Sequence, residues 1–156
     1  MTAGTGLLRP GLLSGAKIAL AQLGEGGPAA ACRSELECAD ALIVDAAAAR
    51  GESLGATLSD TWSAVHGYAG ALIEAARPGR VFLVAPPDEG AAAALENLAR
   101  TLSVEWARRS ITVVTIARAD ATSAADVATL VAYLCSPAGG YFSGCLLDMR
   151  SGSQSG

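Results

Sequence analysis

The sequence has few of the residues from which active sites are usually built. Lys17 is its only lysine and His66 its only histidine, and aromatic residues make up 4% of the 156 residues. The cysteines form no CxxC pair, and they stand at Cys32, Cys38, Cys135 and Cys145. A structural zinc site takes paired Cys and His ligands, so we expect no metal site and interpret the cysteines as buried free thiols.

Basic residues are also scarce. The chain has 11 Lys and Arg against 15 Asp and Glu, a net charge of −4, and its arginines are scattered. This excludes a basic stripe of the kind that binds nucleic-acid phosphates or anionic lipid. Charge or glycine interrupts each apolar run before the about 18 residues of a membrane span, and Arg9 and Pro10 break the apolar stretch that a signal peptide needs. We therefore expect a cytoplasmic protein that binds neither nucleic acid nor membrane.

What the chain does have is apolar residues, at 51% of the composition, much of it alanine. Its length suits one domain with a proper core. We expect a flexible leader at residues 1–15, one domain at 16–152 and a disordered tail at 153–156. An apolar excess on a short chain also indicates that a partner covers part of the surface.

Apolar runs and helical patterns alternate along the domain. The runs predict strands at residues 17–23, 41–47, 81–85, 111–117 and 145–149. The helical patterns between them lie at residues 29–39, 60–77, 88–109 and 126–136. Strands joined by helices in this way predict a parallel sheet with right-handed crossovers.

The helix at 88–109 has the clearest pattern in the chain. Leu95, Leu98 and Leu102 recur at three- and four-residue spacing, with Val104 and Trp106 beyond, which indicates one apolar stripe facing the core. Asp88 is expected to cap this helix.

The other helices have similar end signals. Ser59 or Asp60 is expected to cap the helix that ends at 77, and Pro78 with Gly79 to end it. Trp62 is expected on its core face. Thr122 or Ser123 is expected to cap the helix at 126–136.

Two stretches resemble the C-terminal half of the short-chain dehydrogenase/reductase family: ENLARTLSVEWARRSITVVTIA and VATLVAYLCSPAGGYFSGCLLDMRSG. The likeness extends more weakly back to Lys17. It implies a single, shortened Rossmann-like domain of the α/β class. Strands two and three of the family would be missing, with the half of the fold that holds adenosine. This leaves a doubly wound parallel sheet of about five strands, order 1-4-5-6-7 in the family's numbering, with helices on both faces.

The same alignment removes the family's catalytic residues. Asp88 and Ala92 stand where the family has the tyrosine and lysine of Tyr-x-x-x-Lys, and Pro86 or Pro87 stands for the catalytic serine. The relay asparagine falls near Ala69. The Pro-Gly that touches the nicotinamide is replaced by Arg118 and Ala119, and the substrate lid is absent. We therefore assign no catalytic residue to this chain.

A glycine-rich turn follows the first strand. Gly24, Gly26 and Gly27 precede Pro28 and a helix, where backbone amides suit an anion. Their spacing is not the Gly-x-x-x-Gly-x-Gly of the family's dinucleotide loop. This spacing favours a simple strand-to-helix turn, and we expect these glycines to form at most a weak anion site.

The resemblance leads to a functional hypothesis. The elements that the alignment keeps are those through which the family's subunits associate. We expect a catalytically silent subunit without cofactor, structural or regulatory, that forms a homo-oligomer or pairs with a complete paralogue. The contacts would come from helices 60–77 and 88–109 and strand 145–149.

Two other classes stay open. The first is an enzyme, either an oxidoreductase with a reduced site that still binds NAD(P) or a cofactor-free isomerase or cyclase that uses Asp88 or His66. The second is a small-ligand module in which the glycine turn holds a phosphate or acyl-CoA group.

Overall fold

The computed structural model describes residues 18–22, 39–48 and 53–150 of the chain. The predicted leader, the tail, most of the helix at 29–39 and the glycine turn lie outside these residues. The predictions made for them stay predictions.

The described residues form one parallel sheet, as the sequence predicts. Its strands are β1 (Ile18–Gln22), β2 (Ala41–Asp45), β3 (Gly79–Ala85), β4 (Ile111–Ala117) and β5 (Leu146–Asp148). They lie side by side in chain order, and each pairs with its neighbour in parallel. In the family's numbering this is the order 1-4-5-6-7, so the predicted fold class is confirmed.

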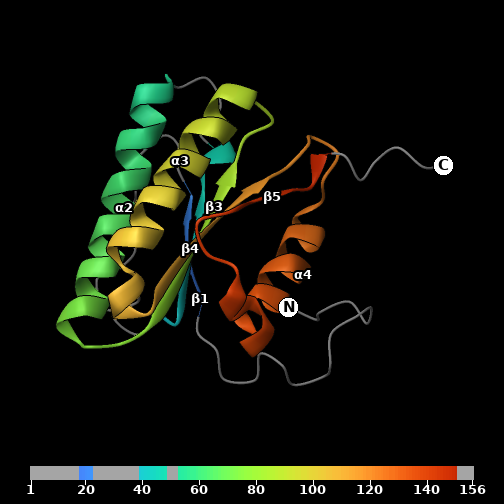
Figure 1. Cartoon of the computed structure of the whole chain (residues 1–156). Coiled ribbons are helices and arrows are strands. Elements are labelled where there is room, and N and C mark those ends of the chain that lie inside the picture. Colours follow the sequence, from blue (N-terminus) through green and yellow to red (C-terminus); the bar gives the residue numbers. More distant parts are fainter. Residues whose placement is uncertain (1–17, 23–38, 49–52, 151–156) are drawn as a thin grey trace.

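Helices cover both faces of the sheet (Figure 1). The long helices α2 (Leu54–Glu74) and α3 (Glu89–Glu105) lie on one face, and α4 (Ala124–Cys135) lies on the other. Short 3-10 turns η1 (Ala46–Ala48), η2 (Ala107–Arg109) and η3 (Pro137–Tyr141) complete the connections. The architecture is therefore a three-layer, doubly wound α/β fold.

Side chains along β3 and β4 point alternately to the two faces of the sheet, and so contribute to a hydrophobic core on each face. Val81, Leu83 and Val113 pack against α2 and α3, whereas Phe82 and Val114 pack against α4. Successive strand residues point to opposite faces, so a strand buried on both faces is apolar throughout. This is why VFLVA and ITVVTIA appear in the sequence as unbroken apolar runs.

The ends of α3 and α4 lie where the sequence places them. The side chain of Asp88 accepts a hydrogen bond from the backbone N–H of Ala91, and the side chain of Ser123 accepts one from Asp126. The prediction for α2 was wrong by more than a turn, because Ser53 caps it and the helix begins at Leu54 rather than near Asp60. A serine cap inside what resembled a loop allowed the helix to start earlier.

The apolar stripe of α3 also differs from the prediction. Leu95 and Leu102 are buried, but Leu98 is only partly buried and Val104 is 78% exposed. The core face is completed by small residues, at Ala91, Ala92 and Ala99. On α2, Trp62 is 41% exposed rather than in the core. On α3, small alanine side chains thus pack against the core where bulkier residues were expected.

The free thiols are partly buried. Cys135 and Cys145 carry no disulfide, and burial raises the pKa of both thiols. Cys32 and Cys38 lie outside the described residues. Among the described helices, none has the length and hydrophobicity to cross a membrane.

Candidate functional site

The carboxyl ends of the strands are where an open α/β sheet binds ligands. In this chain the register places Asp45 beside Val84, Ala85 beside Ala117, and Ala117 beside Asp148. The residues that come next are Pro86 after β3, Arg118 after β4 and Met149 after β5. These residues form the carboxyl edge.

The carboxylates at the carboxyl edge are engaged in local structure. Asp45 accepts the backbone N–H of Ala47 at 3.1 Å, and Asp88 accepts that of Ala91 at 2.7 Å. Asp148 pairs with the guanidinium of Arg150 at 2.8 and 2.9 Å. The hydrogen bonds from Arg150 lower the pKa of Asp148 to about 2. These groups therefore serve as caps and turn partners, and Asp88 is confirmed as the cap of α3.

Arg118 is the exception at this edge. Its Nε is buried without a hydrogen-bond partner, and no carboxylate of the described residues forms an ion pair with it. A buried N–H usually has a partner, so this one is unusual. The family resemblance aligns Arg118 and Ala119 with Pro-Gly and gives no sign of this buried guanidinium.

The positions aligned with the family's tyrosine and lysine have structural roles in α3. Asp88 is bound to the first turn of α3, and Ala92 is 2% exposed and packs in the core. A lysine at Ala92 would have to bury its ammonium. Ala69, at the position of the relay asparagine, is buried as well.

The tyrosines lie on other elements than α3. Tyr68 is buried on α2, and its hydroxyl donates to the carbonyl of Ala39 at 3.2 Å. Burial raises the pKa of its phenol well above the usual value. Tyr133 on α4 and Tyr141 in η3 are exposed. His66 is exposed on α2 beside Trp62, with ring centroids 5.1 Å apart.

The predicted ligand residues are only partly placed. Gly24, Gly26 and Gly27 lie outside the described residues, so the weak anion site stays a prediction. Within the described ranges, no group of three or more Cys, His, Asp or Glu residues could hold a metal ion.

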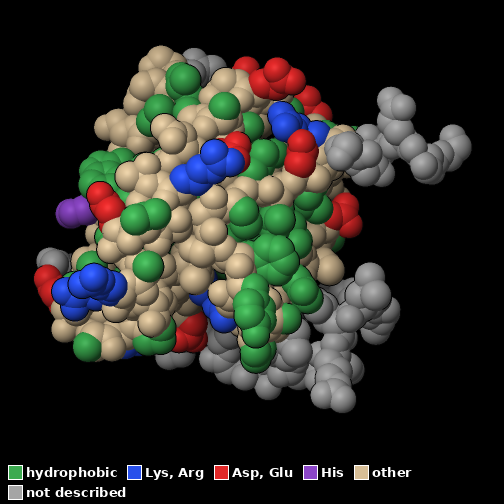
Figure 2. All heavy atoms as spheres, in the orientation of Figure 1, with side chains coloured by type: hydrophobic (Ala, Val, Ile, Leu, Met, Phe, Trp, Pro, Cys, Tyr) green, Lys and Arg blue, Asp and Glu red, His purple; other side chains and the backbone are tan. Residues whose placement is uncertain are grey.

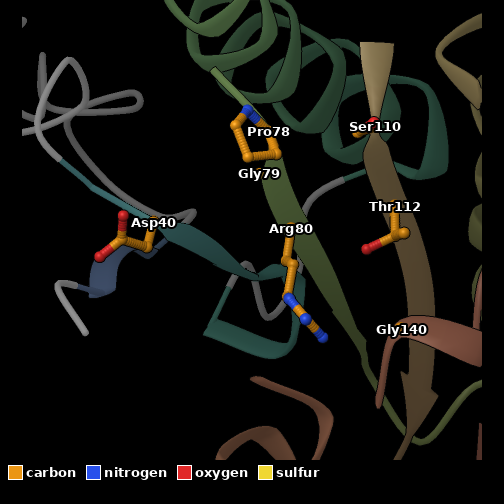
Figure 3. Close-up of a pocket in the computed structure, with 7 residues that line it drawn as sticks. All are labelled: Asp40, Pro78, Gly79, Arg80, Ser110, Thr112 and Gly140. Carbon is orange, nitrogen blue, oxygen red and sulfur yellow. The ribbon is translucent and has the colours of Figure 1, made fainter. Parts of the chain in front are cut away.

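A cavity of about 510 Å³ lies at the opposite, amino edge of the sheet (Figure 3). Residues that precede or begin strands line it, together with η3: Asp40, Pro78, Gly79, Arg80, Ser110, Thr112 and Gly140. We call it the amino-edge cavity. Sequence reasoning missed it, although a charged residue at the start of a buried strand, Arg80, was a visible signal.

Comparisons with known proteins agree with the fold. No protein-family model matches the chain, and no curated protein matches it. Among solved structures, RhlG of Pseudomonas aeruginosa, an NADP active-site complex, matches with a TM-score of 0.58 at 19% identity, over 73% of this chain and 66% of that one. A short-chain dehydrogenase/reductase from Brucella ovis matches with 0.56 at 16% identity, over 78% and 74%. A 4-hydroxyisoleucine dehydrogenase complexed with NADH and succinate matches with 0.55 at 15% identity, over 69% and 67%.

This chain spans 66 to 74% of the length of the three proteins. At such low identity these matches establish the fold alone. The sheet order, the two long helices on one face and the short final strand all agree with that fold. The chain has the fold of the short-chain dehydrogenases/reductases, and its described residues form a sheet of five strands.

Proposed function

We propose that this chain is a catalytically silent subunit, structural or regulatory, that works in the cytoplasm by associating with a second chain of the same fold. The second chain is either another copy or a complete short-chain dehydrogenase/reductase. The contacts come from the exposed sides of α2 and α3 and from the region of β5.

Two glycines in the C-terminal half of α2 carry this proposal. Gly67 and Gly70 are helical, and a Cβ added to either would meet no atom within 4 Å. Glycine inside a helix costs about 0.5 to 1 kcal/mol relative to alanine. Neither a positive φ nor a close neighbour within the described chain requires glycine there. Close approach of a second chain explains why both positions lack a side chain.

The surroundings of these glycines suit an interface. We define the α2–α3 face by uncharged residues of both helices that are exposed or partly exposed: Ser59, Trp62, Ser63, His66, Gly67 and Gly70, with Ala93, Asn97, Thr101 and Val104. Glu96 and Arg100, also on α3, are not part of this face and pair with each other at 2.6 Å. Interface cores are poor in charge and rich in aromatic residues, which fits a face of small residues around an exposed tryptophan.

A second apolar surface lies near β5. Tyr141 is 92% exposed, and Tyr133 packs edge-on against Phe142 with ring centroids 6.4 Å apart. Figure 2 shows an apolar patch over η3 and α4 on this side of the molecule. β5 is also an edge strand, whose outer backbone groups invite pairing with another chain.

Replacing both glycines with alanine should affect folding stability and association in opposite directions. We expect the double change Gly67→Ala and Gly70→Ala to stabilise the dissociated chain by about 0.5 to 1 kcal/mol per site, because alanine is the better helix former. The added methyl groups should weaken association at the same time. Urea unfolding at high dilution measures the first effect, and sedimentation velocity measures the second.

Gly55→Ala is the matched control, since Gly55 lies in the first turn of α2 and its added Cβ meets only Ser53 Oγ at 4.0 Å. It should leave association unchanged. Association that is unaffected in the double variant would contradict the proposed interface.

The competing function is an NAD(P)-dependent oxidoreductase, as suggested by the NADH and NADP complexes of two matched proteins. The carboxyl edge is poorly suited to it, because Asp88, which caps α3, and the buried Ala92 stand where the resemblance places the catalytic tyrosine and lysine. We expect no enhancement of NADPH fluorescence at millimolar cofactor, under conditions in which a complete dehydrogenase shows it. Saturable enhancement would favour the oxidoreductase instead.

A further inference from the structure

The amino-edge cavity lies away from the carboxyl edge and from the α2–α3 face, so neither site accounts for it. Its walls come from the starts of β3 and β4 and from η3. Figure 3 shows the guanidinium of Arg80 and the hydroxyl of Thr112 facing the same hollow.

The sheet register places these two side chains next to each other. Arg80 of β3 pairs with Thr112 of β4. Two residues further along each strand, Phe82 and Val114 pack in the core under α4. Residues two apart on a strand share a face, so Arg80 and Thr112 leave the sheet side by side on the α4 face. The strands thus fix a guanidinium and a hydroxyl in one row at the edge of the core.

A hydrogen bond to α4 also fixes the position of the Arg80 side chain. Its Nη1 donates a hydrogen bond to the carbonyl oxygen of Leu134, near the end of α4. A guanidinium has five N–H donors in a rigid fork. The hydrogen bonds of the described residues use only this one, so the remaining donors are free to bind a ligand.

Among the described residues, no carboxylate pairs with the guanidinium of Arg80. The carboxylate in the cavity wall, that of Asp40, forms an ion pair with Arg77 at 3.0 Å. No carboxylate of the described residues lies within ion-pair distance of Arg80. Thr112 and Ser110 add hydroxyl groups to the same wall. The cavity therefore offers positive charge and hydrogen-bond donors together.

The amino-edge cavity is large enough for a small metabolite. Its volume of about 510 Å³ falls in the range of small-molecule sites. At Gly140 in its wall, an added Cβ would meet no atom within 4 Å, so this side is open. We propose that the amino-edge cavity binds a small organic anion, a carboxylate or a phosphate monoester. Its oxygens accept the free N–H groups of Arg80 and the hydroxyl of Thr112, as forked guanidinium groups bind such oxyanions.

Titration with inorganic phosphate and with succinate, in chloride buffer at constant ionic strength, tests this site. Two-dimensional ¹H–¹⁵N NMR should show saturable shifts of the Arg80 Nε–H and of the Thr112 amide with at least one of the two anions. Arg80→Gln should weaken that binding by about tenfold or more, because it removes a charge-assisted hydrogen bond. Thr112→Val should weaken it less and keep the shape of the wall.

Arg109→Gln is the control, since it removes one positive charge from an exposed residue near the same edge. The affinity of this variant for the anion should match that of the wild type. If Arg80→Gln does not fold, Thr112→Val decides. The proposal is overturned by an absence of saturable shifts with both anions, by shifts confined to residues outside the cavity, or by equal losses in the cavity variants and Arg109→Gln.

Discussion

Leu95→Asp is expected to prevent folding. The leucine is 0% exposed, in the core between α3 and the sheet. The hydroxyl of Thr115 donates to its backbone carbonyl at 3.1 Å, so α3 and β4 are joined at this point. An unpaired buried carboxylate costs several kcal/mol, comparable to the whole stability of about 5 to 15 kcal/mol of a domain. Far-UV circular dichroism and urea unfolding would show the loss.

Val104→Asp provides the matched control on the same helix. Val104 is 78% exposed, so the same exchange of an aliphatic side chain for a carboxylate should change the free energy of unfolding by no more than about 0.5 kcal/mol. Its effect should instead appear as weaker association, because Val104 belongs to the α2–α3 face. A folded Leu95→Asp variant with near wild-type stability would contradict the packing of α3.

Gly139→Ala is expected to destabilise the protein by about 3 kcal/mol, at the upper end of the usual cost of overpacking. A Cβ at this position would lie 1.9 Å from the backbone oxygen of Leu134 and 2.3 Å from its carbonyl carbon. These are backbone atoms in the last turn of α4, so no side-chain rotation relieves the contact. The same carbonyl oxygen accepts the hydrogen bond of Arg80, so the change should also disturb the amino-edge cavity.

Gly140→Ala is the matched control for the destabilisation expected of Gly139→Ala. Gly140 precedes Tyr141 in the same 3-10 turn, and its added Cβ meets nothing within 4 Å. Gly140→Ala should therefore leave the midpoint of urea unfolding almost unchanged. Equal midpoints for the two variants would mean that η3 is not packed against α4 in the way described.

The sheet could be predicted from the sequence because each strand is a short apolar run with a local signal at its ends. VFLVA follows Arg80 and ITVVTIA follows Ser110, and β3 and β4 lie at these runs. The resemblance to a known family then supplied the strand order. The cap of α2 was predicted wrongly, and the core face of α3 was predicted in part: Leu95, Leu102 and Trp106 are buried, whereas Val104 is exposed. Ser53 lies in a loop-like stretch, and the buried alanines of α3 give no signal of bulk.

The sites were harder to predict for a different reason. Arg80 and Thr112 are far apart in the sequence, and only the register of β3 against β4 makes them neighbours. The unpartnered Nε of Arg118 likewise depends on what packs around it after β4. The face of α2 could be predicted only in part. The family resemblance indicated the helix, but the open space beside Gly67 and Gly70 is a property of the folded chain.

The silent-subunit proposal and the anion-site proposal are independent of each other. The first rests on the α2–α3 face, and the second rests on the opposite side of the sheet, under α4. An anion site without an association partner would place the chain among small-ligand binding proteins. Association without anion binding would leave the subunit role intact.

Native mass spectrometry tests the central claim most directly. The tagged wild-type chain and a Gly70→Leu variant would be recovered from the cells of origin and measured side by side. We expect the wild type to carry, in stoichiometric amount, a second copy or a complete short-chain dehydrogenase/reductase, and the folded variant to have lost it. A wild-type chain found only as a monomer, or a complex that persists unchanged in Gly70→Leu, would contradict the account.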